Sequence, residues 1–235
     1  MATTDASSPR ERYRTQVRAE IKKHAWEQIA NAGASALSLN AIAKQMGMSG
    51  PALYRYFAGR DELITELIRE AYRSLADTLR TASATGAGLA APAHALRAWA
   101  LADPQRYLLI YGTPVPGYKA PEDVTGIADE IMKTLLDVCT APTPRGPASA
   151  FTAHLKDHRD RAGGHPAPPA ALRQALAFWT RLHGVLSLEL AGHFTSMGFD
   201  PALFFTAELD ELLAPPGLIT VPGRSGRRSR GPMRL

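Results

Sequence analysis

Residues 38–60 combine small, hydroxyl-bearing and basic side chains at short spacing, with Arg55 between Tyr54 and Tyr56. An arginine can bind a guanine edge or a phosphate, and tyrosine hydroxyls donate to phosphate oxygens. Small side chains let a helix approach base edges closely. The chemistry indicated is recognition of double-stranded DNA. The candidate DNA-binding residues are Ser38, Asn40, Lys44, Ser49, Gly50, Pro51, Ala52, Tyr54, Arg55, Tyr56 and Arg60.

Two short helices joined by a tight turn are needed to position these residues. Ser38 is a good helix cap, and apolar residues recur on one face over residues 39–46. Gly47 tolerates the left-handed conformation that ends a helix. Ser49 caps a second helix, and Pro51 fits its first turn. The pattern predicts a helix-turn-helix. The alternative is a buried helical hairpin with core tyrosines, which the caps and the turn length disfavour.

Flanking segments complete a DNA-binding unit. Apolar residues recur every three or four positions from about residue 14 to 31, which predicts a supporting amphipathic helix. We expect the helix-turn-helix domain to cover residues 14–58 and a disordered basic arm to cover residues 1–13. Residues 59–80 predict a longer fourth helix that connects this domain to the rest of the chain.

The runs LSLNAIAKQMGMSGPALYRYF and AGRDELITELI resemble the DNA-binding domain of TetR-type (TetR/AcrR) transcriptional repressors. That family combines a Ser/Thr-capped helix, a G-(V/M)-S turn, an (A/T)-L-Y-x-(H/Y)-F recognition helix and a (K/R)-(D/E)-x-L start to the fourth helix. The resemblance covers about residues 14–79. Gly59 departs from it, because the family often has a better capping residue there. The resemblance implies a sequence-specific transcriptional regulator.

Trp99 and the segments DPQRYLLIYGTPVPGYKAP and FWTRLHGVLSLELAGHF resemble the ligand-binding domain of one TetR-type subgroup, marked by W-x-x-x-H-G. This resemblance implies a regulatory and dimerisation domain, over residues 90–213, that holds a small molecule. Apolar walls with a few polar tips are typical of such sites. The alternative is that the aromatic residues are simply core. The candidate pocket residues are Trp99, Tyr107, Tyr111, Phe178, Trp179 and His183.

A helix near residues 172–190 carries two apolar stripes, so two surfaces must cover it. One helix-turn-helix reads only a few base pairs, and a dimer reads two half-sites. We therefore expect a homodimer that binds an imperfect inverted-repeat operator. The candidate interface residues are Leu182, Leu186, Leu190, Phe204 and Leu209.

Charge is unevenly distributed along the 235 residues. Residues 1–80 carry 12 basic and nine acidic residues, and residues 81–223 carry 10 and 13. The final 12 residues carry five arginines and no acid, so we expect a disordered basic tail over residues 214–235. This distribution suits a protein whose N-terminal part binds nucleic acid.

The cysteine count and the lack of long apolar segments indicate the cellular compartment of the protein. The lone Cys139 excludes an internal disulfide and fits a reducing cytoplasm. No apolar run is long enough for a membrane span, and the first residues lack the apolar segment of a signal peptide. We therefore expect a cytoplasmic protein without a membrane partner.

Other function classes have weaker support. No GxSxG motif or phosphate-binding glycine loop occurs, so we expect no enzyme, no catalytic residue and no cofactor beyond an unknown small-molecule effector. His154 and His158, with Asp157 or Asp160, could hold a divalent metal, but a solvated polar loop fits that segment better. The remaining alternative is a nonspecific or architectural DNA-binding protein without an effector. The fold class expected is all-α, with two domains.

Overall fold

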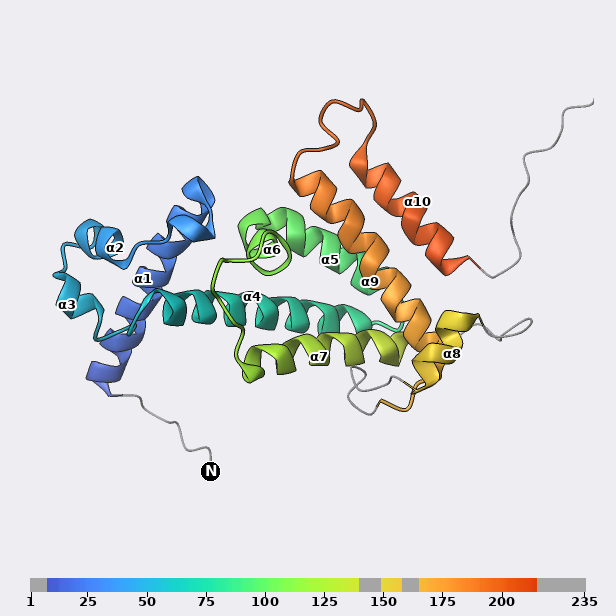
Figure 1. The fold of residues 1–235 in the computed structure, drawn as a ribbon, viewed down its shortest axis with the longest axis horizontal. Coiled ribbons are helices and arrows are strands. Elements are labelled where there is room, and N and C mark those ends of the chain that lie inside the picture. Colours follow the sequence, from blue (N-terminus) through green and yellow to red (C-terminus); the bar gives the residue numbers. More distant parts are fainter. Residues whose placement is uncertain (1–7, 140–148, 158–164, 215–235) are drawn as a thin grey trace, which may run out of the picture.

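The computed structural model describes residues 8–139, 149–157 and 165–214, and every regular element within them is a helix (Figure 1). This confirms the all-α fold. The elements form an elongated body with α1 to α3 at one end and α5 to α10 around the other (Figure 1). In chain order they are α1 (Pro9–Ala32), the 3-10 turn η1 (Ala34–Ala36), α2 (Leu39–Gln45), α3 (Gly50–Leu53), α4 (Arg60–Ser83), α5 (Ala90–Ala102), α6 (Pro104–Tyr111), α7 (Glu122–Val138), α8 (Ala150–Asp157), α9 (Pro169–Leu190) and α10 (Pro201–Leu213).

Helix α1 begins earlier than the sequence pattern predicts. Ser8 and Glu11 form a capping box: the Glu11 N–H donates to the Ser8 hydroxyl at 3.2 Å, and the Ser8 N–H donates to the Glu11 carboxylate at 2.7 Å. Pro9 occupies the first helical position, where its missing N–H has no consequence. The expectation of a disordered arm is therefore wrong for residues 9–13. Residues 1–7 lie outside the described part of the chain.

Helix α4 belongs to two hydrophobic cores. Its first half, including Leu63 and Leu67, packs with α1, α2 and α3, and its second half, including Leu75 and Leu79, packs with α5, α7 and α9. The shared helix spans about 36 Å at 1.5 Å per residue. The N-terminal core also contains Val115 and Val124 of α7, so the two halves of the chain interlock.

The C-terminal half closes around α9. Helix α10 packs antiparallel against α9, and α5 lies beside both (Figure 1). Arg97 of α5 donates two hydrogen bonds to Glu189 of α9, at 2.9 and 3.0 Å, with both side chains 14% exposed. The Arg97 guanidinium also lies 5.4 Å from the centre of the Phe205 ring of α10. One arginine thus holds three helices together.

A smaller apolar cluster joins α7, α8 and α9 through Leu136, Leu155 and Leu172. Cys139 packs against it, and burial raises the pKa of its thiol to about 12. This favours a packing role for Cys139 over a reactive one, because so little thiolate is present at neutral pH. Among the described helices, none is long and apolar enough to cross a membrane.

Candidate DNA-binding surface and adjoining cavity

The turn between α2 and α3 forms as the sequence predicts. The Ser38 hydroxyl accepts the Ala41 N–H at 3.3 Å and so caps α2. The Ser38 N–H donates to the Gln28 side chain at 2.9 Å, which joins this cap to α1. Gly47 adopts φ +64°, in the left-handed region that glycine enters at low cost.

Helix α3 is shorter than the predicted recognition helix. Its α-helical residues are Gly50–Leu53, and residues 54–56 continue as turns. Ser49 stands at its N-cap but its side chain makes no capping hydrogen bond. A Cβ atom at Gly50 would lie 3.4 Å from the Asn40 amide oxygen, which is ordinary van der Waals contact.

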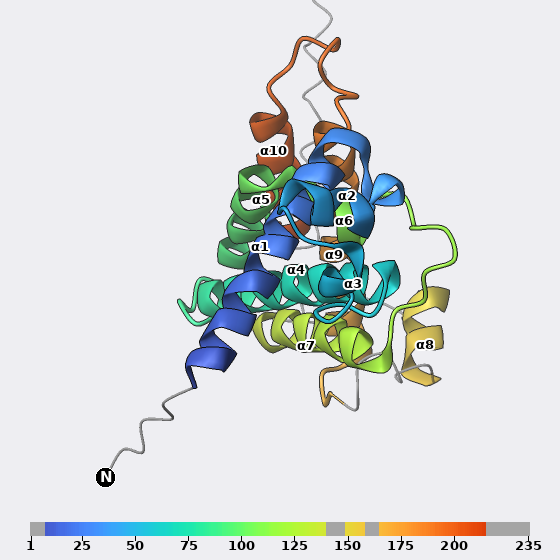
Figure 2. The same ribbon diagram turned by 90° about the vertical axis from the view of Figure 1, so that its left-hand side faces the viewer.

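Most of the predicted DNA-binding side chains are exposed together at one end of the molecule, where α2 and α3 face the viewer in Figure 2. Tyr54 is 47% exposed, whereas Tyr56 is partly buried against the N-terminal core. Ala52 and Gly50 are half-buried. The exposed members are Asn40, Lys44, Ser49, Pro51, Tyr54 and Arg55.

Arg60 differs from the other predicted DNA-binding residues because its guanidinium has protein partners. It donates to the carbonyls of Leu37 at 3.2 Å, Ala34 at 2.9 Å and Ser35 at 3.2 Å. Arg60 therefore attaches the start of α4 to the segment before α2. Its position suits a structural role better than a phosphate contact.

Arg18 plays a similar part that the sequence pattern did not reveal. Its guanidinium donates to the Tyr56 carbonyl and lies 4.0 Å from the centre of the Phe57 ring. The carboxylates of Glu62 and Glu66 lie 4.0 Å from its nitrogens. This arginine fixes the turn that follows α3, and no local motif identifies it because its partners are about 40 residues away.

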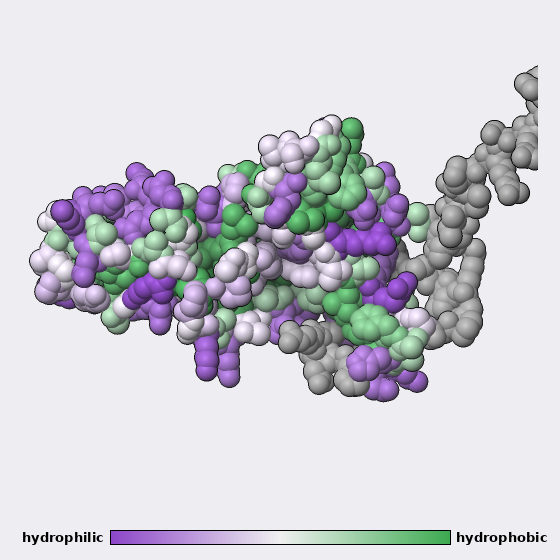
Figure 3. All heavy atoms as spheres, turned by 45° about the horizontal axis from the view of Figure 1, so that its top comes forward, coloured by the Kyte–Doolittle hydropathy of each residue, from purple (hydrophilic) through white to green (hydrophobic). Residues whose placement is uncertain are grey.

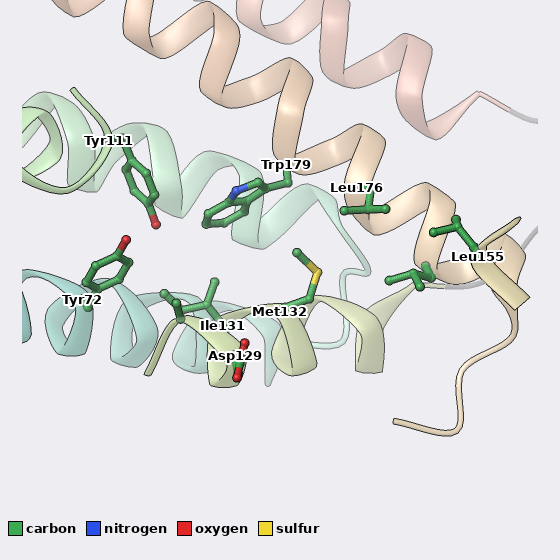
Figure 4. Close-up of a pocket in the computed structure, with 10 residues that line it drawn as sticks. Tyr72, Tyr111, Asp129, Ile131, Met132, Leu155, Leu176 and Trp179 are labelled. Atoms are coloured by element: carbon green, nitrogen blue, oxygen red, sulfur yellow. The ribbon is translucent and has the colours of Figure 1, made fainter. Parts of the chain in front are cut away.

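A cavity of about 660 Å³ lies in the C-terminal half, between α4, α6, α7, α8 and α9 (Figure 4). Tyr72 and Tyr111 stand at one end, with their hydroxyls pointing toward one another, and Leu155 and Leu176 stand at the other (Figure 4). The lining residues are Tyr72, Tyr111, Ala128, Asp129, Ile131, Met132, Leu155, Leu172, Leu176 and Trp179.

Of the predicted pocket residues, Tyr111 and Trp179 line this cavity and the other four do not. Phe178 is fully buried core, and Trp99 donates its indole N–H to Ser74 of α4 at 3.1 Å. For these four residues the prediction is wrong, because their side chains point into packed regions around the cavity.

Tyr107 and His183 form a buried polar contact behind the cavity wall. The Tyr107 hydroxyl lies 2.9 Å from the His183 Nδ1 and 2.9 Å from the Ser187 hydroxyl. The His183 ring packs on Trp179 and Tyr111, with ring centres 4.1 and 4.3 Å apart. Burial lowers the pKa of His183 to about 3, so its ring is neutral at pH 7.

The predicted partner surface needs a correction. Leu182 and Leu186 are 0% exposed and Leu209 is 2% exposed within a single chain, so they cannot contact a second copy. A group of exposed apolar residues lies instead around the connection between α9 and α10, where Figure 3 shows hydrophobic residues gathered. Leu190 is partly buried and Phe204 is exposed. The exposed residues of this group are Leu188, Met197, Phe199, Leu203 and Phe204.

Residues 21–67, which contain α2 and α3, match the family described as "Bacterial regulatory proteins, tetR family". Residues 89–212 match the family described as "Tetracyclin repressor-like, C-terminal domain". The chain belongs to the TetR family. It is 34% identical to the HTH-type transcriptional regulators Rv1816 of Mycobacterium tuberculosis and Mb1846 of Mycobacterium bovis, over 86% of this chain and 92% of each relative.

Solved structures share the fold. The crystal structure of SCO4313 has 72% sequence identity and a TM-score of 0.82, and the match covers 88% of this chain and all of that one. A Rhodococcus sp. RHA1 protein with 21% identity and a TM-score of 0.61 shares the fold. The protein is therefore a TetR-family transcriptional regulator with a DNA-binding helix-turn-helix. The subgroup that the W-x-x-x-H-G motif suggests stays a prediction.

Proposed function

We propose that the protein is a homodimeric repressor that binds an inverted-repeat operator and releases it when a small molecule enters the cavity. Asn40, Lys44, Ser49, Pro51, Tyr54 and Arg55 would contact DNA, with Arg55 and Tyr54 placed for bases and phosphates. As a regulator of transcription it would act in the cytoplasm, beside the chromosome. No step in this activity calls for catalysis.

The observation that carries the proposal is the position of α4. Leu63 and Leu67 of this helix pack in the same core as α3, and Tyr72, one to two turns later, forms part of the cavity wall. A ligand that moves Tyr72 would therefore move the helix on which the DNA-binding residues rest. Binding of ligand and binding of DNA must then affect each other by the same factor.

Ion pairs join α4 to α1 and to α7, which supports the transmission of a ligand-induced movement through α4. Lys22 of α1 pairs with Glu70 of α4, which lies two residues before Tyr72. Arg69 of α4 pairs with Asp123 at 2.7 Å and Arg73 pairs with Glu130 at 2.7 Å, and both carboxylates belong to α7. These contacts favour motion of α4 together with its neighbours over independent bending.

The exposed apolar residues near the α9–α10 connection support the homodimer. Leu203 is 70% exposed and Met197 is 63% exposed. Burial of such apolar side chains in an interface is favourable, because it removes their surface from water. A two-fold pairing through this surface would place two helix-turn-helix units for the two halves of an inverted repeat.

Selection of bound duplexes from a random pool, followed by binding measurements at two salt concentrations, tests the proposal. We expect an inverted repeat that binds at least about 1,000-fold more tightly than random DNA. Equal binding of all duplexes with a steep salt dependence would instead identify a nonspecific, charge-driven binder. In that case removal of residues 224–235, with their five arginines, would abolish binding, whereas a specific regulator would barely change.

A further inference from the structure

The Tyr111 hydroxyl is the most informative group in the cavity. It is buried and has no hydrogen-bond partner among the described residues, and Figure 4 shows it pointing into the space between α4 and α9. A buried hydroxyl without a partner has lost its hydrogen bonds to water without replacing them, which destabilises the protein. A buried polar group without a partner in the protein needs an explanation, and a bound ligand is one.

The state of this hydroxyl decides what it can bind. Burial raises the pKa of Tyr111 well above its usual value, and burial also raises the pKa of Tyr72. Both phenols are therefore protonated at neutral pH, and each has a hydrogen to donate. Figure 4 shows the two hydroxyls converging at the same end of the cavity, so an acceptor placed there would be within reach of both donors.

The charges around the cavity disfavour an anion. No lysine or arginine belongs to its lining in the described parts of the chain, and the lining includes the carboxylate of Asp129. The nearby His183 ring packs behind Tyr111 and Trp179 and is neutral at pH 7. A carboxylate or phosphate brought into this space would lose its hydration without gaining a cation.

The opposite end of the cavity suits an apolar body. Leu155, Leu172 and Leu176 form this end, and Ile131 and Met132 of α7 form one side. Its volume of about 660 Å³ falls within the range of about 300–1,000 Å³ that holds small ligands. Burial of carbon chains here would supply most of the binding free energy, and the polar end would set orientation.

We infer that the effector is an uncharged, mostly apolar molecule with a hydrogen-bond-accepting oxygen, to which the Tyr111 hydroxyl donates. This inference rests on the proposed function, since it names the ligand class of the regulatory cavity. The oxygen lies at the Tyr72 and Tyr111 end, and the apolar part extends toward α8.

Three probes that share a ten-carbon chain and differ in their head group test this inference on the full-length protein by isothermal titration calorimetry. Decan-2-one carries a neutral acceptor, decanoate an anion and decyltrimethylammonium a cation. We expect decan-2-one to bind at least about ten-fold more tightly than either charged probe. Tighter binding of a charged probe, or no binding of decan-2-one up to its solubility limit, would overturn the inference.

The hydroxyl itself is tested with Tyr111→Phe and a matched control, Tyr118→Phe. Tyr118 also has a buried hydroxyl without a described partner, but it does not line this cavity. It lines a neighbouring cavity of about 350 Å³ beside the 112–120 loop, which shares only Tyr72 and Ala128 with the first. Tyr111→Phe should weaken decan-2-one binding by about ten-fold and Tyr118→Phe should leave it unchanged. Equal affinity in the wild type and Tyr111→Phe would contradict the inference. The probe series on the wild type decides the question should Tyr111→Phe fail to fold.

Fluorescence anisotropy of the selected operator separates this inference from the proposed function. Release of DNA by decan-2-one would support both. Binding of decan-2-one with the expected dependence on Tyr111, but without any change in operator affinity, would reject ligand-controlled repression and leave the ligand class standing.

Discussion

Basic residues of the N-terminal half divide into those that hold the fold and those that are free to meet DNA. Arg60 donates to three backbone carbonyls, and Lys44 is exposed on α2. Arg60→Ala removes these donors and leaves part-buried carbonyls unpaired, so it should lower the free energy of unfolding by about 1–3 kcal/mol. Urea denaturation measures this change.

Lys44→Ala is the matched control for Arg60→Ala. It should leave the urea midpoint unchanged, weaken binding to all duplexes and reduce the slope of log affinity against log salt by about 1. Equal stability of the two variants would refute the structural role of Arg60.

The two exposed residues after α3 are expected to contact different parts of the DNA, Arg55 a base and Tyr54 a phosphate. Arg55→Ala should cost about 1–3 kcal/mol of operator affinity and relax the preference at one base position. Tyr54→Phe removes only a phosphate donor, so it should weaken all sequences to a similar degree. Binding to a panel of singly substituted operators distinguishes the two effects. A uniform loss for Arg55→Ala would show that this arginine contacts phosphate.

His183 should make stability depend on acid pH. Its pKa is about 3 in the folded chain because of burial, with Tyr107, Tyr111 and Trp179 around its ring. The unfolded chain has a pKa near 6.5, so it binds a proton that the folded chain does not between those values. Stability is therefore lost as pH falls below about 6.5, by about 2 kcal/mol from pH 7 to pH 5.

Comparison with His183→Gln isolates this contribution, because the other histidines remain. Urea denaturation at pH 7 and pH 5 should show a smaller loss of stability on acidification in His183→Gln than in the wild type. The same loss in both proteins would place the acid sensitivity elsewhere.

Helix caps and turns set by single residues are the most predictable part of the structure. Ser38 caps α2 and Gly47 forms the turn that follows it. Asp103 likewise caps α6, because its carboxylate accepts the Arg106 N–H at 3.1 Å. Arg18 and Arg60 could not be assigned in the same way, because their partners are distant in sequence and exist only once the helices have packed.

At the scale of elements, α4 should couple the stability of the two cores. Leu75 is fully buried in the C-terminal core, and Leu75→Ala leaves a cavity that should cost about 2–5 kcal/mol. Because α4 also completes the N-terminal core, the amides of α1 should lose hydrogen-exchange protection together with those of α5. Unchanged protection in α1 would show that the two halves unfold independently.

Helix periodicity predicted which segments are helical, but less well where they end or which side they bury. The capping box at Ser8 was present in the sequence and extends α1 to Pro9. The two apolar stripes of α9 are also visible in the sequence, yet periodicity does not say what covers each one. The structure buries Leu182 of one stripe and Leu186 of the other within a single chain, and leaves Leu188, which belongs to neither stripe, exposed.

At the scale of the whole molecule, the cavity was the least predictable feature. Aromatic residues of α6 and α9 suggested a pocket, but four of the six candidates are enclosed by packing. Half of the actual lining comes from α7 and α8, whose apolar residues are typical of any amphipathic helix. The empty space depends on how five helices meet, which no single segment determines.

The exposed leucine of α10 provides the decisive test of assembly. In a two-fold dimer Leu203 occurs twice, so Leu203→Glu removes two buried side chains and adds two charges to the interface. At about 1.5–3 kcal/mol for each leucine, the dimer should weaken by at least about 100-fold. Sedimentation velocity should then show a monomer whose circular dichroism and melting cooperativity match those of the wild type.

Leu101→Glu is the control for Leu203→Glu, because Leu101 is also an exposed leucine but lies at the end of α5. It should remain dimeric and bind the inverted repeat normally. Leu203→Glu should lose affinity for the complete repeat while keeping the wild-type affinity for a single half-site, since its helix-turn-helix is untouched. A Leu203→Glu protein that stays dimeric would show that the two copies meet through another surface, and the half-site geometry would then have to be derived from that surface.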